Sequence, residues 1–452
     1  MSSFIKAYKV PILAGFFSVL LYWFFAFELV RSDFLRLLGL YAGLFVFAYI
    51  LIKYCGWNFW LLAGFGTVFR LVFYPAIPNL SQDFYRFILD GQLMASFTNP
   101  YLYTPLELQQ NTALLEFGNL NMLIEGMGNL NASHYSNYPP VNQLFFLLAD
   151  LFPGKSILST VVGLRTLIIL ADLGTLYVGK RLLGLLGMPK HTIFWFFLNP
   201  FIIIECTGNL HFEGVMLFFL LAGLYQLFKQ RWIWAAVLIG LSVSVKLIPL
   251  LFLPLFFRYF VRKGAVGKGL TRLSAFYTVA IGTVAITFAP FLSSEFIANF
   301  SKTISLWFQD FEFNASVYYI IRYIGFQTIG WNIIADVGKV LPVIVFASVL
   351  LLSFFRRNET PKALITAMLL AVSIYFLLST TVHPWYIATP LLLGLFTRYR
   401  YALLWSFMGI VSYAAYGANG FDENLWWVAL EYVVVIGYAI WELALRKDRS
   451  GL

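Results

Sequence analysis

Charged residues are scarce in this sequence. Only 12% of its 452 residues are Asp, Glu, Lys or Arg, whereas 60% are hydrophobic and 19% are aromatic. Soluble domains carry about a quarter charged residues, so the composition excludes an ordinary soluble protein. It predicts a polytopic integral membrane protein.

Cysteine is also rare, and several familiar signatures are missing. Cys55 and Cys206 fall at the end of one apolar run and inside another, which excludes a disulfide framework and a cysteine-ligated zinc site. The sequence has neither a Gly-rich phosphate loop nor a Rossmann fingerprint, so no soluble nucleotide-binding domain is expected. The net charge of +10 comes without a basic, aromatic-interleaved patch, and we therefore expect no nucleic-acid partner.

Long apolar runs make up most of the chain. Runs able to cross about 30 Å of hydrocarbon predict an all-α fold with about 12–14 transmembrane helices and additional helices in extracytoplasmic loops. Prolines at 249, 254 and 390 indicate half-spans or kinked helices near 232–260 and 386–397. The expected spans are 9–29, 36–54, 58–78, 156–180, 192–207, 212–228, 232–246, 247–260, 273–292, 332–354, 362–381, 386–397, 402–417 and 426–445.

The distribution of basic residues predicts the topology. Most of the 31 Lys and Arg residues fall in loops on one side of the predicted spans, which places both termini in the cytoplasm of a bacterial inner membrane. Residues 1–55 are expected to form an N-terminal transmembrane hairpin, and 56–452 the main transmembrane domain. Its long external loops are 79–155 and 293–331.

The stretch "NLSQDFYRFILDG" (79–91) gathers charges at the external end of a predicted span. Ser81 is expected to cap a helix with Asp83 in its first turn. At about 100° per residue, Asp83 and Asp90 return to one helix face with Arg86 between them. A helix N-terminus and an arginine should hold the pKa of Asp83 low, which suits a charged base or a metal ligand. The commoner meaning of this spacing is a surface ion pair.

Three of the four histidines, His134, His211 and His383, fall on the same predicted face. Each alone is more often a hydrogen-bonded structural residue than a ligand or base. Ionisable residues inside spans tend to line cavities, and two of them, Arg70 and Lys246, lie near the predicted outer leaflet. There a cation suits the phosphate of a lipid-linked substrate, with snorkelling to lipid headgroups as the alternative. The others are Arg165, Asp172, Glu205 and Lys339, and snorkelling is the expected role of Lys339.

Several blocks resemble one known family. The stretch "RLVFYPAIPNLSQDFYRFILDGQLMASFTNPYLYTP" (70–105) resembles the first-loop signature of polytopic GT-C glycosyltransferases, in particular bacterial mannosyltransferases that use polyprenyl-phosphate mannose. "YPPVNQLFF", "LNPFIIIECTGNLHFEGVML", "KLIPLLFLPLFF" and "HPWY" match later family blocks in order, so the resemblance spans about residues 65–400. Gln82, Leu89 and Glu213 depart from the family pattern, where aspartate, tryptophan and aspartate are usual. The loss of an acid at 82 weakens the case for a metal held by two carboxylates.

The resemblance implies transfer of a sugar, with mannose expected, from a polyprenyl-phosphate donor to an extracytoplasmic glycan or lipid acceptor, with inversion at the anomeric carbon. Asp83 would be the general base. No cofactor is required, and a divalent metal, with Asp83 and His211 as candidate ligands, is left open. The other expected substrate-binding residues are Arg70, Tyr85, Arg86, Asp90, Asn99, Tyr101, Tyr138, Asn209, His211, Glu213, Lys246, His383, Trp385 and Tyr386.

Two other readings stay open at this point. Buried charges and broken helices are also typical of a transporter or lipid flippase. The absence of two halves with matching hydropathy or motifs, and the position of the strongest charge cluster at one end of the spans, speak against transport. Gln82 also suggests a catalytically inactive scaffold.

Overall fold

The protein is an all-α polytopic membrane protein. A computed structural model describes residues 2–110, 118–262, 264–418 and 420–445, and only one two-stranded hairpin, β1 (Tyr416–Gly417) and β2 (Gly420–Phe421), interrupts the helices there. Residues 111–117 of the predicted external loop and the C-terminal 446–452 lie outside the described residues. The predicted fold class is confirmed.

The described part of the chain contains seven helices that are long and apolar enough to cross a membrane, together with four shorter apolar segments and one sharply bent pair. The described residues thus contain fewer full-length membrane-spanning helices than the 12–14 expected, because several of the apolar runs are broken into shorter segments. The seven long helices are α1 (Ser2–Phe27), α2 (Phe34–Cys55), α8 (Ile157–Leu185), α14 (Val266–Phe288), α17 (Ile334–Phe354), α18 (Pro361–Leu378) and α21 (Leu425–Ile440).

The predicted span 192–207 is not one helix. It consists of a 3₁₀ turn (η1, Lys190–Ile193), α9 (Phe194–Phe197), α10 (Pro200–Ile202) and a π-helical turn (η2, Ile203–Gly208). The chain then bends by 113° into α11 (Glu213–Phe228). Asn199 precedes a proline and is disfavoured in a helix, and Leu210 adopts a left-handed backbone conformation with φ of 64°. These two breaks explain why continuous hydrophobicity does not give a continuous span.

Proline-containing runs form the expected half-spans. After α12 (Trp232–Val245), the segment with Pro249 and Pro254 is a 3₁₀ helix, η3 (Ile248–Phe256), followed by α13 (Phe257–Phe260). The later run divides into η5 (Pro384–Ile387) and α19 (Ala388–Gly394), and the next into α20 (Tyr401–Met408) and η6 (Gly409–Ala415). The expected half-spans near Pro249 and Pro254 are thus confirmed as short, irregular helices, whereas Pro390 lies inside α19.

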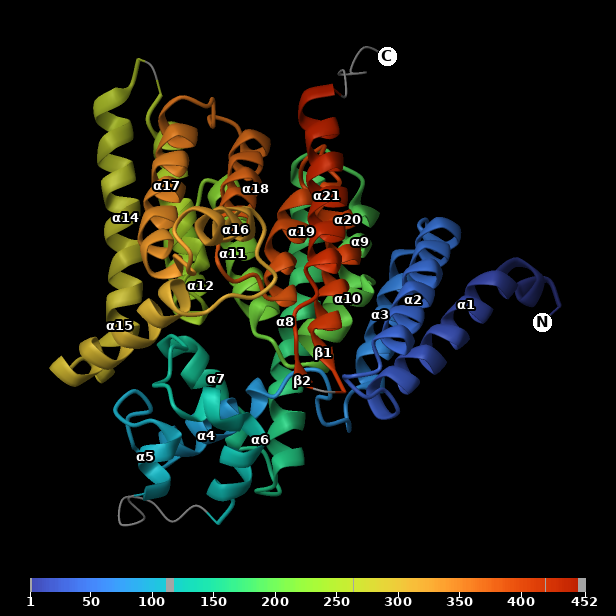
Figure 1. Ribbon diagram of the computed structural model, residues 1–452. Coiled ribbons are helices and arrows are strands. Elements are labelled where there is room, and N and C mark those ends of the chain that lie inside the picture. Colours follow the sequence, from blue (N-terminus) through green and yellow to red (C-terminus); the bar gives the residue numbers. More distant parts are fainter. Residues whose placement is uncertain (1, 111–117, 263, 419, 446–452) are drawn as a thin grey trace.

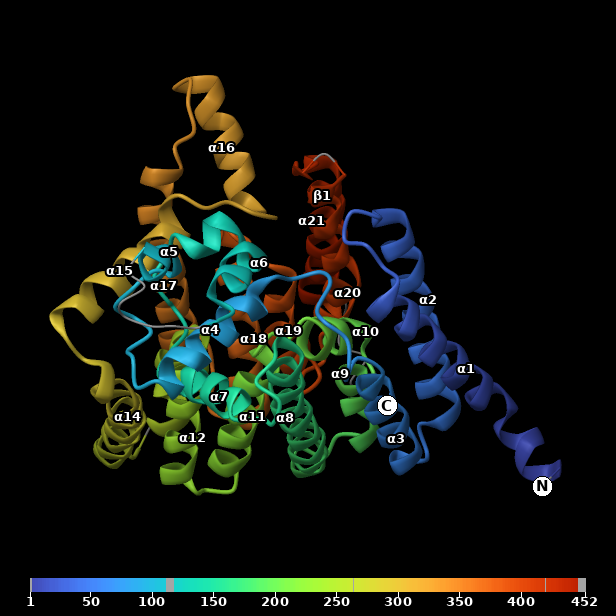
Figure 2. The same cartoon turned by 90° about the horizontal axis from the view of Figure 1, so that it is seen from below.

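The long loop 79–155 is folded rather than extended. It contains α4 (Asp83–Ala95), α5 (Pro105–Gln110), α6 (Leu120–Ala132) and α7 (Pro140–Asp150), which lie together at the end of the helix bundle opposite the C-terminal end of α21 (Figure 1). α4 packs closely on α7. The approach requires a glycine at position 91, since a side chain there would meet the carbonyl of Phe146. Loop 293–331 contributes α15 (Ser294–Gln309) and α16 (Val317–Thr328), and α16 extends from the edge of the molecule in Figure 2.

Buried charges inside the spans fix the broken segments in place. Arg70, at the end of α3 (Phe59–Val72), forms a 2.7 Å ion pair with Asp172 of α8, and neither side chain is exposed. Arg165 of α8 donates to the carbonyls of Thr207 and Gly208 at 2.9 and 3.0 Å. The π-helical turn leaves these carbonyls without helical partners of their own, so the guanidinium stabilises the bend.

Removing Asp172 should be strongly destabilising. Asp172→Ala leaves the Arg70 guanidinium buried without its carboxylate, which costs about 3–5 kcal/mol. We expect a clear drop in the apparent melting temperature of the purified protein in detergent. The double variant Arg70→Met, Asp172→Ala should recover part of that loss, because no unpaired charge remains; a double variant as unstable as Asp172→Ala would contradict this account.

Candidate active site

Asp83 is the first residue of α4. The residue that precedes the helix is Gln82, and its side chain makes no capping bond, so the expectation that Ser81 is the capping residue is wrong. Ser81 Oγ nevertheless accepts a 3.3 Å hydrogen bond from the backbone N–H of Asp83. The side chain of Asp83 is half-buried, and among the described residues its carboxylate has no hydrogen-bond or ion-pair partner. A partnerless carboxylate at a helix start is free to accept a proton from a substrate.

Burial, rather than neighbouring charge, dominates the electrostatics of Asp83. Loss of solvent raises the pKa of Asp83 to about 6, although the positive charges of Lys246 and Arg31 act in the opposite direction. The expectation of a low pKa is therefore wrong. Helical spacing shows which charged residues of α4 share a face with Asp83. It does not show how far this carboxylate is removed from water, which sets the direction of its pKa shift.

Arg86 is turned away from Asp83. It forms a 2.8 Å ion pair with Asp90, one helical turn later, and donates to the carbonyl of His134 at 2.8 Å. Asp90 also accepts hydrogen bonds from Ser136 and Gln143 at 2.5 and 2.8 Å, and all of these groups are buried. The alternative interpretation of this spacing, an ion pair, is thus correct for Arg86 and Asp90. The pair lies in the interior rather than on the surface, and Asp83 is not part of it. The cluster ties α4 to α7 and to the segment that precedes α7.

Four further predicted residues organise the external layer. Asn99 Oδ1 accepts from the backbone of Tyr101 at 3.0 Å, and the hydroxyl of Tyr101 donates to the carbonyl of Tyr138 at 2.6 Å. The ring of Tyr138 lies edge-on to Phe87 of α4. Tyr85 packs against α6, where only a glycine at 126 leaves room for its ring.

Residues from two distant sequence blocks meet in a stack of three rings. Trp385 of η5 lies between His211 and His383, with ring centroids 3.6 Å and 4.5 Å apart and interplanar angles of 19° and 7°. Burial lowers the pKa of His383 to about 3, so this imidazole is neutral at physiological pH. Nε2 of His211 and Nδ1 of His383 are buried and have no hydrogen-bond partner in the part of the chain that the structure describes, which leaves two polar atoms available to a ligand.

The bent pair brings further polar groups to the same stack. His211 Nε2 lies 3.8 Å from Glu205 Oε2, which accepts a 3.2 Å hydrogen bond from the amide of Asn209. Glu213, at the start of α11, forms an ion pair with Lys246 at the end of α12. The ammonium of Lys246 lies 6.0 Å from the ring centroid of Tyr386.

His134 and Arg70 stand apart from this cluster. The imidazole of His134 contacts Ser133 at 3.3 Å in the external layer, and Arg70 is occupied by Asp172. The expected contact of Arg70 with substrate stays a prediction, and the present partners of both residues favour a structural role.

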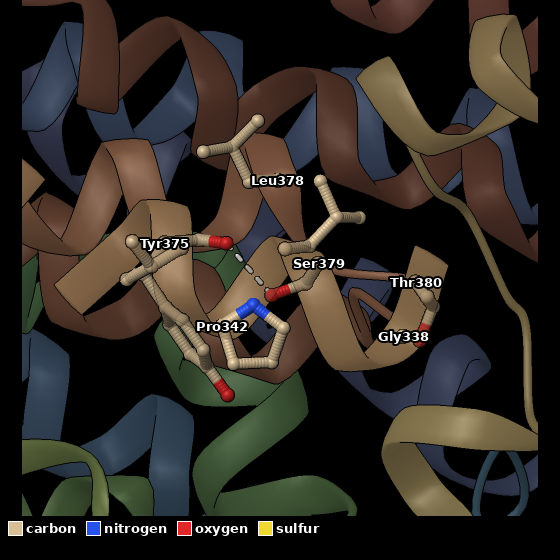
Figure 3. Close-up of a pocket in the computed structure, with 8 residues that line it drawn as sticks. Gly338, Pro342, Tyr375, Leu378, Ser379 and Thr380 are labelled. Atoms are coloured by element: carbon tan, nitrogen blue, oxygen red, sulfur yellow. Dashed lines mark hydrogen bonds between the residues drawn. The ribbon is translucent and has the colours of Figure 1, made fainter. Parts of the chain in front are cut away.

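A small cavity lies near the segment that leads to His383, but it is not a substrate site. It is lined by residues of α17 and by Tyr375, Leu378, Ser379 and Thr380 at the end of α18, and Ser379 Oγ donates to the carbonyl of Tyr375 at 2.7 Å (Figure 3). A cavity of about 10 Å³ holds about one water molecule. A sugar ring does not fit there.

Sequence reasoning missed three residues at this site. Arg31, in the turn between α1 and α2, stacks on Tyr416 with its guanidinium carbon 3.3 Å from the ring centroid. The hydroxyl of Tyr413 donates to Glu205 at 2.9 Å. One available signal was the position of Arg31 at the predicted external end of the hairpin, where the topology rule disfavours arginine.

Comparison with known proteins agrees with this arrangement. A family model described as "Alpha-(1->6)-mannopyranosyltransferase, N-terminal domain" matches residues 40–262. The resemblance to membrane mannosyltransferases of the GT-C type is confirmed. The matched region contains Asp83, the Arg86–Asp90 pair and the bent segment with His211, and it begins after Arg31.

Two relatives have similar sequences over most of this chain. Alpha-(1->6)-mannopyranosyltransferase A of Mycobacterium tuberculosis is 23% identical over 328 residues, which cover 70% of this chain and 61% of that protein. The protein of the same name from Corynebacterium glutamicum is 24% identical over 361 residues, covering 74% of this chain and 70% of the relative. This chain thus spans about three fifths of the mycobacterial protein. Both relatives are named as transferases, which does not favour the transporter alternative.

The acidic and histidine side chains do not form an evident metal centre. Within the described ranges no three His, Cys, Asp or Glu side chains are grouped as ligands, and Asp83 and His211 form no such set. A divalent metal held by Asp83 and His211 stays a prediction.

Proposed function

We propose that the protein transfers mannose from a polyprenyl-phosphate donor to a glycan or lipid acceptor outside the cytoplasm. The observation that carries this proposal is the half-buried, partnerless carboxylate of Asp83 beside Lys246, within a chain similar to named mannosyltransferases. A carboxylate with a pKa of about 6 is mostly ionised at neutral pH, and it is a stronger base than an exposed aspartate.

The reaction needs one base and a stabilised leaving group. Asp83 accepts the proton of the acceptor hydroxyl as that oxygen attacks the anomeric carbon. The bond between this carbon and the phosphate oxygen breaks, and the electron pair leaves with the phosphate. Because a phosphate is a good leaving group, general-acid assistance is dispensable, unlike in glycoside hydrolysis. Direct attack inverts the anomeric configuration, so an α-linked product, as in the relatives' names, requires a β-linked donor.

The ring stack suits the sugar. Tyr386 offers an apolar ring of the kind on which sugar rings pack, whereas both faces of Trp385 are covered by the imidazoles of His211 and His383. The unpartnered nitrogens of these two imidazoles suit hydrogen bonds to sugar hydroxyls. A lipid-linked donor enters sideways between helices, which accounts for the lack of a nucleotide-binding domain in the sequence. The basic loops support an inner-membrane protein with cytoplasmic termini and the site on the outer face.

Replacement of the base should abolish transfer. Asp83→Asn should lower the transfer rate by about 10²–10⁴-fold, measured with purified protein, radiolabelled polyprenyl-phosphate mannose and a panel of glycan acceptors. Glu125→Gln is a matched control, because it removes an exposed carboxylate from α6 in the same external layer. Full activity of a correctly folded Asp83→Asn protein would refute the assignment. An inactive wild-type protein across the whole panel would support the scaffold alternative.

The activity should fall on the acidic side with an apparent pKa of about 6. A base must be deprotonated, so activity is retained above this pH and is lost as the pH falls through it. Lys246→Met should move this acidic loss of activity to higher pH, because the Lys246 charge lowers the pKa of Asp83. Glu213→Gln should move it to lower pH, because the Glu213 charge raises the pKa of Asp83. Profiles of kcat/KM against pH measure both shifts, and two variants that shift the loss of activity in the same direction would contradict the electrostatic account.

A further inference from the structure

The turn that joins α1 to α2 lies against the proposed site. Arg31 of this turn stacks on Tyr416, and its guanidinium carbon lies 6.0 Å from the ring centroid of Tyr413. Tyr413 in turn donates to Glu205, the carboxylate next to His211. On the other side, Tyr416 packs near Phe313, which contacts His383 at a centroid distance of 5.2 Å. Arg31 is therefore linked through Tyr413 and Tyr416 to neighbours of both ends of the ring stack.

Among the described residues Arg31 has no carboxylate partner, unlike three other cations near the site. Arg70, Arg86 and Lys246 each form an ion pair with a carboxylate. Within the described ranges the guanidinium of Arg31 has no such partner and no hydrogen-bond acceptor, and its Nε is buried and unsatisfied. Stacking on an aromatic ring stabilises a cation but does not neutralise it. The uncompensated charge acts on Asp83 and His383, as the direction of its effect on both groups indicates.

The position of Arg31 is fixed by contacts to the segment that precedes the proposed base. The amide of Asn79, four residues before Asp83, donates to the carbonyls of Phe25 and Leu29 at 2.8 and 2.9 Å. These carbonyls belong to the end of α1 and to the turn. The ring of Tyr22 in α1 also packs on Phe69 of α3, with centroids 5.2 Å apart.

The second helix of the hairpin, α2, contacts α20 and α21. The hydroxyl of Tyr41 in α2 donates to the carbonyl of Ser406 in α20 at 2.5 Å. Phe34 of α2 packs against Trp427 of α21, with centroids 5.2 Å apart. Both helices of the hairpin are thus bonded to or packed against other parts of the fold, and α1, α2 and α3 lie side by side (Figure 2).

We propose that Arg31 binds the phosphate of the lipid-linked donor, so that the N-terminal hairpin is a functional part of the donor site. This inference rests on the function proposed above. Guanidinium groups recognise phosphate through two parallel hydrogen bonds. The donor phosphate carries one negative charge as a diester and gains a further one when the bond to the sugar breaks, so a nearby uncompensated cation stabilises the departing group.

Binding of a sugar-free ligand tests this proposal separately from transfer. Quenching of intrinsic tryptophan fluorescence would measure the affinity of purified protein, in an uncharged detergent, for a short-chain polyprenyl phosphate. Arg31→Gln should weaken binding by about 10- to 100-fold, the loss expected for a charge-assisted pair. Arg31→Lys should retain part of the affinity, because it keeps the charge and loses the planar fork. Lys9→Gln, which removes an exposed cation from the same hairpin, should bind as the wild type does.

Competition identifies the source of the phosphate. Inorganic phosphate and phosphatidylglycerol should each displace the polyprenyl phosphate only at much higher concentration. Displacement by phosphatidylglycerol at equal concentration would identify a bilayer headgroup as the ligand and would overturn the donor assignment.

The remaining outcomes separate the two proposals. Wild-type affinity in folded Arg31→Gln overturns the role of Arg31 while the proposed function stands. A wild-type protein that binds no polyprenyl phosphate overturns the donor named under the proposed function, and the role of Arg31 with it. If Arg31→Gln does not purify as a monodisperse protein, Arg31→Lys decides, because unchanged affinity in that variant would exclude phosphate recognition by the guanidinium fork.

Discussion

A charge removed from water must be compensated, and this constraint shapes the whole interior of the protein. The cost of an unpaired ion in an apolar medium is several kcal/mol or more. The buried cations of α3, α4 and α8 accordingly find carboxylates or backbone carbonyls, and they lie where the fold is least regular. Among the described residues, the Asp83 carboxylate and the Arg31 guanidinium have no such partner. A free base and a free cation are the combination that the proposed transfer from a phosphate ester to an alcohol requires.

Broken helices supply the geometry that the site needs. A regular membrane-spanning helix satisfies its own backbone hydrogen bonds, and its side chains point away from the helix axis. The bend after η2 instead places a short polar segment between two helices. There His211 meets Trp385 from a block more than 170 residues away in sequence. The carbonyls that the π-helical turn exposes are bonded by Arg165, so the irregular backbone is supported by protein rather than by lipid.

The sequence was sufficient for the fold class, the folded external loop and the position of Asp83 at a helix start, because these follow from apolar run length and from the proline break before 79. The predicted topology also placed His211 and His383 on the same side of the membrane. The sequence did not predict the raised pKa of Asp83, since burial depends on how α4 packs against helices distant in the chain. Arg31 was missed for the same reason. Periodicity describes one helix at a time, and no local pattern shows which turn of one hairpin lies against a residue numbered 416.

The two hydrogen bonds of Asn79 have a mechanical consequence. One amide links the end of a membrane-spanning helix to the residues that lead into α4, so the end of α1 is joined directly to the segment that precedes the carboxylate. A helix adjusts its tilt to the thickness of the surrounding bilayer. A change in bilayer thickness that alters the tilt of α1 would therefore be expected to act on the segment that leads to Asp83 as well.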